Sequence, residues 1–240
     1  MKTADTRRTE ERMAGLFASH RPFSEHLLKW EDPELPDKYD HNCFEYTGQP
    51  TEEEFEKALA YQKRQGASFI KLEGNDPLEE SFGLEESVTL TMVLKTAGDF
   101  RRVNGKLTFR KPSLSEMEDM ELRHFGPVYG DDFTRRNIRR LYEKLDYIGA
   151  YLEGRLAGSC YSFTSGGLTC IDGLIVDDRY RHRYIATSII SEIGKRHPDS
   201  VLFLHADQDD TPKEMYRKLG FETTDQLYEY LCTDIQEPGL

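Results

Sequence analysis

The segment from Val176 to Ala186 has the composition of an anion-binding turn. It passes from an apolar run through a stretch with three arginines, Arg179, Arg181 and Arg183, into an amphipathic helix pattern. The first turn of a helix exposes N–H groups and the positive end of the helix dipole, so a junction of this kind can hold a pyrophosphate with arginines nearby. The alternative is a solvated basic turn that only caps a helix.

A second segment, residues 209–221, specifies a short helix in detail. Thr211 is expected as the N-cap, Pro212 occupies the first helical position, and Glu214 completes a capping box. Gly220 suits the left-handed position that ends such a helix, after which an apolar residue returns the chain to the core.

The first segment resembles the acyl-coenzyme A signature of the GNAT superfamily of acetyltransferases, Gln/Arg-x-x-Gly-x-Gly/Ala. Arg181 and Ala186 match this pattern. Tyr184 stands at a glycine position, and His182 stands where many members have another glycine. Because glycine lets the backbone approach a phosphate closely, we expect Tyr184 to keep an ordinary helical φ and to turn its ring away.

The second segment resembles the family pattern N-x-x-A-x-x-L-Y-x-K-x-G-F. Asp209 replaces the asparagine and Pro212 the alanine. The matching residues are Tyr216, Lys218, Gly220 and Phe221. The resemblance implies acetyl-coenzyme A as co-substrate, with its pantetheine arm paired to a strand much as an added strand would be. The residues that it implies in cofactor binding are Leu174, Ile175, Val176, Arg181, His182, Arg183, Tyr184, Ile185, Ala186, Thr187 and Asp209.

Two residues are candidates for acid–base chemistry. In the resembled family the helix tyrosine lies near the thioester sulfur and often acts as general acid, which implies that role for Tyr216; a phenol pKa near ~10 suits protonation of a thiolate. The alternative is a helix tyrosine packed on the sheet. Members of the resembled family often use a carboxylate on the central strands, directly or through water, to take the proton of the amine, which implies Asp172 as the base. This residue lies in an otherwise apolar strand, where an unpaired carboxylate is costly. The alternative is an edge or bulge residue that faces solvent beside Gly173.

The implied reaction is direct transfer of an acetyl group to a primary amine, without a covalent enzyme intermediate. Cys160 and Cys170 are poor candidates for a nucleophile, since no His or Asn partner is evident from their spacing. Two alternatives stay open. One is a non-catalytic acyl-coenzyme A binding or interaction module, which Tyr184 and His182 favour, and the other is a different acyl donor.

Periodicity and capping signals predict the elements of the C-terminal half. The expected order is strand 107–110, a helix opened by Ser113-x-x-Glu116, helix 131–144, strands 147–152, 155–163 and 168–176, helix 185–195, strand 201–206, helix 211–219 and strand 227–231. Glu153-Gly154 and Ser165-Gly166-Gly167 suit turns with positive φ. This order agrees with the α/β (α+β) fold that the resemblance implies, a GNAT-like mixed, mostly antiparallel central sheet flanked by helices.

The N-terminal half is expected to form an additional α+β domain. It begins with a helix whose apolar face includes Met13, Leu16 and Phe17, and the later signals are strand 43–46, a helix capped by Thr51 and Glu54 and ended by Gly66, and strands 68–72 and 87–94. Residues 79–84, Glu-Glu-Ser-Phe-Gly-Leu, faintly resemble Tyr216–Phe221, so this half is a candidate degenerate GNAT-like copy; a chance match is the alternative. Residues 95–106 are the expected linker between domains 1–100 and 107–240.

Composition narrows the function class. A formal charge of −12 argues against nucleic-acid or acidic-membrane partners and favours a cationic amine acceptor, either a small molecule or a protein. No apolar run reaches the ~18–20 residues of a membrane span, and the charged N-terminus lacks a secretory signal, so we expect a cytoplasmic protein. The spacing of four cysteines and seven histidines predicts neither a disulfide nor a metal site. The oligomeric state stays open, with a homodimer as one alternative.

Overall fold

The computed structural model describes residues 3–94, 100–210 and 212–236. The helices are α1 (Thr3–Ala14), α2 (Glu52–Arg64), α3 (Leu114–Tyr129), α4 (Asp131–Lys144), α5 (Ile185–Arg196) and α6 (Pro212–Lys218), with 3-10 helices η1 (Tyr39–His41) and η2 (Asp178–Tyr180). The strands are β1 (Ser19–Pro22), β2 (Leu27–Glu31), β3 (Phe44–Tyr46), β4 (Ile70–Gly74), β5 (Glu85–Leu94), β6 (Thr108–Arg110), β7 (Asp146–Leu152), β8 (Arg155–Ser165), β9 (Leu168–Val176), β10 (Val201–Asp207) and β11 (Phe221–Cys232).

The chain forms two compact units that interleave along the sequence. Unit 1 consists of Met1–Arg12, Met92–His205 and Thr211–Thr224, and unit 2 consists of Met13–Thr91, Ala206–Asp210 and Asp225–Leu240. The sequence analysis predicted two continuous domains, residues 1–100 and 107–240. The two units are not continuous in this way, because β5, β10 and β11 each contribute residues to both.

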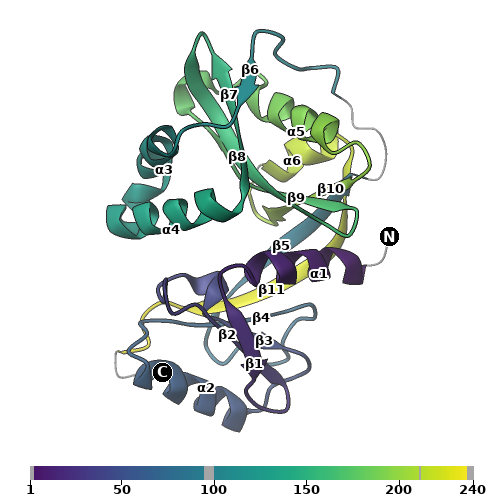
Figure 1. Cartoon of the computed structure of the whole chain (residues 1–240). Coiled ribbons are helices and arrows are strands. Elements are labelled where there is room, and N and C mark those ends of the chain that lie inside the picture. The colour runs from purple at the N-terminus through teal and green to yellow at the C-terminus, as the bar shows by residue number, and fades with distance from the viewer. Residues whose placement is uncertain (1–2, 95–99, 211, 237–240) are drawn as a thin grey trace. The chain divides into compact units, whose positions relative to one another are not determined.

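In unit 1 the strand order is β5-β10-β9-β8-β7-β6. The pairs from β6 to β9 are antiparallel, and β9 pairs with β10 in parallel across the α5 crossover. Helices α3 and α4 lie on one side of these strands and α5 and α6 on the other (Figure 1). Parallel neighbours need such a crossover connection, and a helix supplies it.

Close packing of α5 on this sheet depends on one glycine. Helix α5 packs against β7, β8 and β9 and buries Ile185 and Ile189. A Cβ atom added at Gly158 of β8 would lie 2.8 Å from Cγ2 of Ile185 and 2.9 Å from the Ile175 carbonyl oxygen. Position 158 therefore has to be glycine for the start of α5 to approach β8 and β9 this closely.

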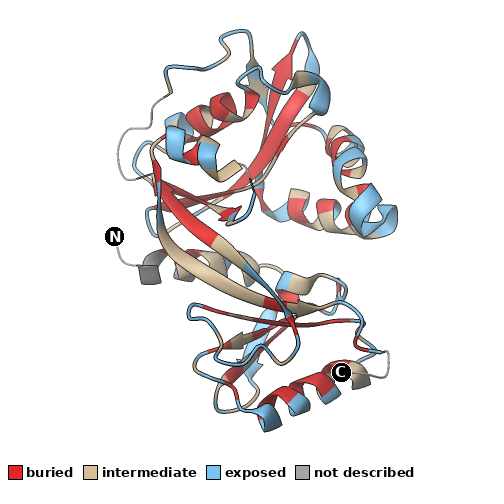
Figure 2. Ribbon diagram, turned by 180° about the vertical axis from the view of Figure 1, so that it is seen from behind, coloured by how far each residue is buried: buried red, intermediate tan, exposed pale blue. Residues whose placement is uncertain are grey.

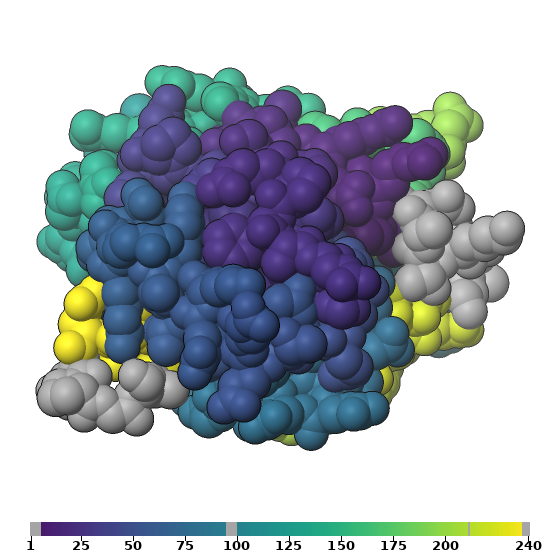
Figure 3. Space-filling model, turned by 90° about the horizontal axis from the view of Figure 1, so that it is seen from below, coloured from purple at the N-terminus to yellow at the C-terminus, as the bar shows by residue number. Residues whose placement is uncertain are grey.

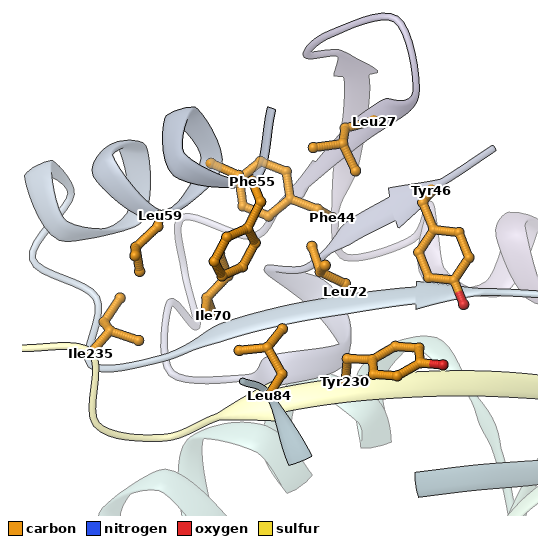
Figure 4. Packing of buried hydrophobic residues seen from close by; sticks show 11 residues of the cluster. Leu27, Phe44, Tyr46, Phe55, Leu59, Ile70, Leu72, Leu84, Tyr230 and Ile235 are labelled. Carbon is orange, nitrogen blue, oxygen red and sulfur yellow. The ribbon is translucent and has the colours of Figure 1, made fainter. Parts of the chain in front are cut away.

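Unit 2 is a sheet covered on one face by α2. Its strand order is β1-β2-β3-β4-β11-β5, with β3 and β4 parallel across the α2 crossover and β4 antiparallel to β11. Figure 2 shows buried residues concentrated on strands and on the helix faces turned toward them, and in Figure 3 the blue residues around α2 lie at the visible surface. Phe55 and Leu59 of α2 pack with Phe44, Leu72 and Tyr230 of the strands (Figure 4).

Charge is divided very unequally between the units. Unit 2 has 24 acidic and 7 basic residues, a formal charge of −17. Unit 1 has 20 acidic and 25 basic residues, a formal charge of +5. The overall value of −12 is therefore the sum of a strongly acidic unit and a mildly basic one.

Most element predictions are confirmed, above all those based on local signals. The capping boxes at Thr51 and Ser113 both form, and the predicted helix 131–144 has the observed bounds of α4. The predicted turns are confirmed by positive φ at Gly154, Gly166 and Gly167. Gly66 and Gly220, with φ of 74° and 96°, end their helices as expected.

Several predictions on element bounds were wrong. The first helix ends at Ala14, so Leu16 and Phe17 follow it in a turn rather than forming its apolar face. Strands β1 and β2 were not predicted, and β11 begins six residues before the expected 227. Residues 79–84 form no helix and instead make a turn before β5. The expected cap Thr211 lies outside the described residues.

The structure also shows the state of the cysteines and bears on membrane spans and metal sites. All four cysteines are free thiols, and Cys160 does not face Cys170 across the β8–β9 pair, since Cys170 is opposite Phe163. Among residues 3–94, 100–210 and 212–236, no helix combines the length and apolar character that crossing a membrane requires. The same residues contain no group of three or more His, Cys, Asp or Glu side chains arranged for a metal ion.

Candidate active site

The chain passes from β9 to α5 through the basic turn. After Val176 it forms η2, capped by Asp177, whose Oδ1 accepts a hydrogen bond from the Arg179 N–H at 3.0 Å. The Arg181 N–H donates to the Asp178 carbonyl oxygen at 3.3 Å, and α5 begins at Ile185. The predicted strand, basic turn and helix are thus present in that order.

The backbone of this turn corrects our expectation for Tyr184. Its φ is 57°, in the left-handed region, and that of His182 is 61°. The expectation of an ordinary helical φ at Tyr184 was wrong, because this residue is the N-cap and redirects the chain into the helix. Its ring does turn outward, since the residue is 50% exposed. Both positions therefore have glycine-like backbone in spite of their side chains.

The first turn of α5 keeps its amide donors available. The first backbone hydrogen bond of the helix runs from the Ser188 N–H to the Tyr184 carbonyl oxygen at 3.0 Å. The side chain of the N-cap Tyr184 makes no cap hydrogen bond, and the first turn holds no acidic residue. Among the residues that the structure describes, the N–H groups of Ile185, Ala186 and Thr187 therefore have no hydrogen-bond partner, and they lie at the positive end of a 12-residue helix.

The three arginines of the turn are not equivalent. Arg179 makes a two-point ion pair with Asp177, at 2.9 and 2.6 Å, and these hydrogen bonds lower the pKa of Asp177 to about 2. Arg181 pairs with Asp178 at 2.7 Å, where both side chains are exposed. Within the described part of the chain, Arg183 makes no ion pair, and its guanidinium lies 5.9 Å from the centre of the Tyr180 ring. Arg183 is the arginine most available to an incoming anion.

Hydrogen bonds of Asn104 connect the basic turn to the first turn of α5. Its Nδ2 donates to the Arg183 carbonyl oxygen at 3.1 Å, and its backbone N–H donates to Ser188 Oγ at 2.9 Å. Ser188 Oγ in turn donates to the Tyr184 carbonyl oxygen at 2.6 Å. This residue was placed in the expected linker, and no local pattern marks it, because its partners lie about 80 residues away.

The pairing of β9 with β10 ends at Ile171. The parallel pairing joins Leu168–Ile171 to Val201–Leu204 and stops there, although both strands continue. On the other side, β9 stays paired with β8, for example Ile175 with Ser159. Among the described strands, the edge of Leu174, Ile175 and Val176 that faces away from β8 therefore has no partner in this register.

Asp172 lies at a bulge in β9 with both carboxylate oxygens engaged. Tyr161 Oη donates to its Oδ2 at 2.8 Å, and the Gly173 N–H donates to its Oδ1 at 2.6 Å. Gly173 has φ 60°, and a Cβ there would lie 2.4 Å from the Tyr161 ring. Asp172 is half-buried, so the bulge presents a carboxylate of fixed orientation rather than a fully solvated one.

The neighbouring thiols are poorly suited to nucleophilic chemistry. Cys160 and Cys170 are fully buried. Burial, followed by the charge of Asp172, raises the pKa of both thiols above the ordinary value. Because the thiolate is the reactive form, neutral thiols are weak nucleophiles.

Tyr216 and Asp209 come later in the chain than β9, the basic turn and α5. Tyr216 is buried in α6, with 8% exposure, and its ring makes an edge contact with Phe221 at 6.0 Å. Asp209 is exposed in the β10–α6 loop, belongs to unit 2, and donates its backbone N–H to Asp207 Oδ1 at 2.6 Å. The roles of both stay predictions.

Sequence reasoning missed Tyr161 as well as Asn104. Tyr161 is opposite Asp172 in the β8–β9 register, and Tyr147 of β7 is opposite Tyr161. The three side chains thus form one row across three strands. Strand alternation placed each residue on a face, but only the register, including the bulge, brings Tyr161 to Asp172.

Comparison with known proteins shows the fold. No family profile and no curated protein matches the sequence. A functionally unknown conserved protein from Staphylococcus epidermidis ATCC 12228 is similar over 90% of this chain and 94% of its own, with 18% identity and a TM-score of 0.78. A GCN5-related N-acetyltransferase from Kribbella flavida is similar over 93% of both chains, with 12% identity and a TM-score of 0.61.

A third solved structure adds the two-part architecture. A tandem GNAT protein from the clavulanic acid biosynthesis pathway covers 93% of this chain and 80% of its own, with 12% identity and a TM-score of 0.57. The protein therefore has a GNAT-like α+β fold, with a mostly antiparallel sheet flanked by helices, as the sequence predicted.

Proposed function

Starting from the GNAT-like fold, we propose that this chain is an N-acetyltransferase that uses acetyl-coenzyme A to acetylate a primary amine by direct attack. The observation that carries the proposal is the uncapped N-terminus of α5. In the part of the chain that the structure describes, its first-turn amides have no partner and its first turn has no acid, and it adjoins Arg183 and the edge of β9 beyond the last residue paired with β10. A diphosphate needs such a donor set, and a pantetheine arm needs such an edge.

The residues fit the co-substrate in two places. The N–H groups of Ile185, Ala186 and Thr187, with the Arg181, His182, Arg183 and Tyr184 turn around them, would hold the diphosphate. The backbone of Leu174, Ile175 and Val176 would pair with the amide groups of the pantetheine arm. Left-handed φ at His182 and Tyr184 supports this arrangement, because it gives the turn the backbone that glycines give it in the resembled signature.

The proposed chemistry is an acyl transfer with two proton movements. The amine nitrogen forms a bond to the thioester carbonyl carbon, the carbon–sulfur bond breaks, and the products are an amide and free coenzyme A. Asp172, directly or through water, takes the proton that the amine loses, and Tyr216 gives a proton to the departing sulfur. The hydrogen bonds from Tyr161 and Gly173 support the first role, since they hold the carboxylate in one orientation.

A cationic amine is the proposed acceptor. Unit 2 carries a formal charge of −17, so its field attracts positively charged substrates over distances of about a Debye length, ~8–10 Å at physiological salt. Polyamines, aminoglycosides, lysine side chains and protein N-termini all meet this condition. The proposal covers small molecules and proteins alike.

We also propose that the N-terminal half is a degenerate second GNAT-like copy. The connection β3–α2–β4 repeats the parallel strand, helix and strand of β9–α5–β10, and the similarity to a tandem GNAT protein supports the repeat. Residues 79–84, which resemble Tyr216–Phe221, also precede a long strand, β5.

The alternative is an acyl-coenzyme A binding module without turnover, which the bulky His182 and Tyr184 favour. Calorimetric titration with acetyl-coenzyme A, combined with a thiol-release assay over a panel of amines, separates the two. Binding with release of coenzyme A in the presence of one amine class supports the enzyme, and Tyr216→Phe should then lose turnover while keeping the affinity. Tight binding without release across the panel would establish the binding module, and no binding at all would remove both.

A further inference from the structure

A surface groove of about 490 Å³ lies on unit 2 beside α2. Its apolar lining comes from Phe55, Leu59 and Ala60 of the helix and from Phe82, which precedes β5. All of its lining residues belong to unit 2.

One wall of the groove is held by unusual backbone. Phe82 has φ 54°, and Gly83 follows with φ 75°, in a turn closed by the Leu84 N–H and the Ser81 carbonyl oxygen at 2.9 Å. A left-handed conformation is unfavourable for an aromatic residue. It places the Phe82 ring on the Phe55 ring, with centres 4.5 Å apart and planes 9° from parallel. These are the residues that faintly resemble the Tyr216 helix, so the segment has a different structural role here.

The rim of the groove is acidic. Glu52 and Glu56 lie one helical turn apart on α2, and Glu80 lies two residues before Phe82. All three are exposed, against a single cation, Lys63, in the lining. In Figure 3 the blue residues around α2 are at the visible surface.

We propose that this groove binds a basic peptide segment, with an apolar side chain in the groove and flanking lysines or arginines on the glutamates. Charge complementarity selects this occupant over an acidic or neutral one, because rim and unit are both strongly negative. The proposal includes an apolar anchor side chain because charge attraction alone would leave the apolar lining, with its stacked Phe55 and Phe82 rings, without a partner in the peptide.

The binding test uses the full chain and a rhodamine-labelled peptide, Lys-Lys-Leu-Phe-Lys-Lys, followed by fluorescence anisotropy. A second peptide, Lys-Lys-Ser-Ser-Lys-Lys, has the same charge without the anchor. We expect the first peptide to bind about tenfold or more tightly than the second, and its affinity to fall as salt is raised.

Matched variants locate the site. Glu56→Gln should weaken binding about two- to fivefold, the range of one exposed ion pair. Glu53→Gln is the control, because Glu53 is an exposed residue of the same helix, outside the groove, and its carboxylate pairs with Lys57 at 2.7 Å. Ala60→Arg should weaken binding at least about tenfold. The arginine fills the groove, and at this exposed helix position its positive charge repels the basic peptide.

Three outcomes would overturn the proposal. Equal effects of Glu53→Gln and Glu56→Gln would mean general attraction to an acidic unit. An unchanged affinity in Ala60→Arg would place the peptide elsewhere. Concentration-dependent self-association of the wild type that Ala60→Arg abolishes, seen by analytical ultracentrifugation, would assign the groove to a second copy of this chain.

Discussion

The β9–α5 junction of unit 1 and the β3–α2 junction of unit 2 are built alike and finished differently. In both, a strand leads through a short turn into a helix, and the helix leads to a parallel strand. At α2 the N-cap Thr51 forms a full capping box with Glu54, and three glutamates occupy the first turn. At α5 no side chain caps the helix, the first turn has no acid, and three arginines precede it.

The difference teaches how one supersecondary unit can either close or open its helix N-terminus. Side-chain caps and carboxylates satisfy the first-turn amides and the helix dipole, which stabilises α2 and repels anions. Leaving the same groups unpaired costs stability at α5 but keeps donors for a ligand. Of these two junctions, the one in unit 1 has the uncapped, acid-free helix start that our proposed diphosphate site requires.

The largest expected effect comes from giving α5 the acidic first turn of α2. Ala186→Glu puts a carboxylate beside the amides that we assign to the diphosphate, so the affinity for acetyl-coenzyme A should fall about 100-fold. The thermal midpoint should stay the same or rise slightly, because a carboxylate favours a helix N-terminus. Calorimetry and thermal melting measure the two effects separately.

Ala186→Gln is the control for that substitution, since it adds the same bulk without charge. We expect it to lose less than about tenfold in affinity. Equal losses in the two variants would point to a steric effect and would remove the charge argument from the comparison.

A smaller effect is expected from opening α2. Thr51→Ala removes the hydroxyl that accepts the Glu54 N–H at 3.2 Å, and the free energy of unfolding should fall by about 1 kcal/mol. The affinity for acetyl-coenzyme A should be unchanged. Urea denaturation gives the first value, with Thr51→Ser as a variant that retains the cap. A full loss in Thr51→Ser too would show that the cap hydrogen bond is not the cause.

Acid should weaken the α2 cap within a definite pH range. Burial acts to raise the pKa of Glu54, but hydrogen bonds from the Thr51 N–H and His26 outweigh it and leave the pKa below its ordinary value. A depressed folded pKa means that the contribution to stability is present above the unfolded value of about 4.3 and is lost as pH falls below it.

Urea midpoints of the wild type and Glu54→Gln at pH 7, pH 5 and pH 3.5 test this. The wild type should have a higher urea midpoint than Glu54→Gln at pH 7 and pH 5, and the difference between the two midpoints should shrink at pH 3.5. A difference that stays constant over this range would mean that Glu54 acts through packing rather than charge.

The smallest effect concerns strain at the open junction. Tyr184→Gly relieves a left-handed conformation that costs about 1 kcal/mol or more, but glycine also gains freedom in the unfolded chain, so the free energy of unfolding should rise by only about 0.5 kcal/mol. Tyr184→Ala keeps the strain and should show no rise. If both variants gain equally, the benefit comes from removing an exposed aromatic ring instead.

Elements fixed by neighbouring residues were predicted well, whereas β1 and β2 were missed for a physical reason. All four residues of β1 are exposed, so the strand has no alternating pattern. Lys29 interrupts the apolar pattern of β2, yet it is buried. Its Nζ donates to the Asn42 carbonyl oxygen at 2.7 Å and lies 4.7 Å from the centre of the Phe44 ring, and burial lowers its pKa to about 8. The groups that make burial of this lysine tolerable are provided by tertiary structure.

The candidate site was predictable in part for the same reason. The order of strand, basic turn and helix is local, so the residues of the turn were found from their spacing. The left-handed φ of Tyr184 was not, because the turn is held from outside by Asn104. Asp172 was chosen for its apolar surroundings, but its partner Tyr161 follows only from the register of two strands and a bulge.

The sequence by itself determined where helices begin, where glycines end them, and which turn carries the arginines, because caps, turns and helix periodicity depend on residues within a few positions of one another. The tertiary structure decided which segments, distant in the sequence, lie in the same unit. Residues 206–210 and 225–240 hold seven acidic residues and no basic one, and only the folding of these segments into unit 2 gives that unit its charge of −17. Composition sets the total charge, but the contacts between distant segments decide which unit carries it.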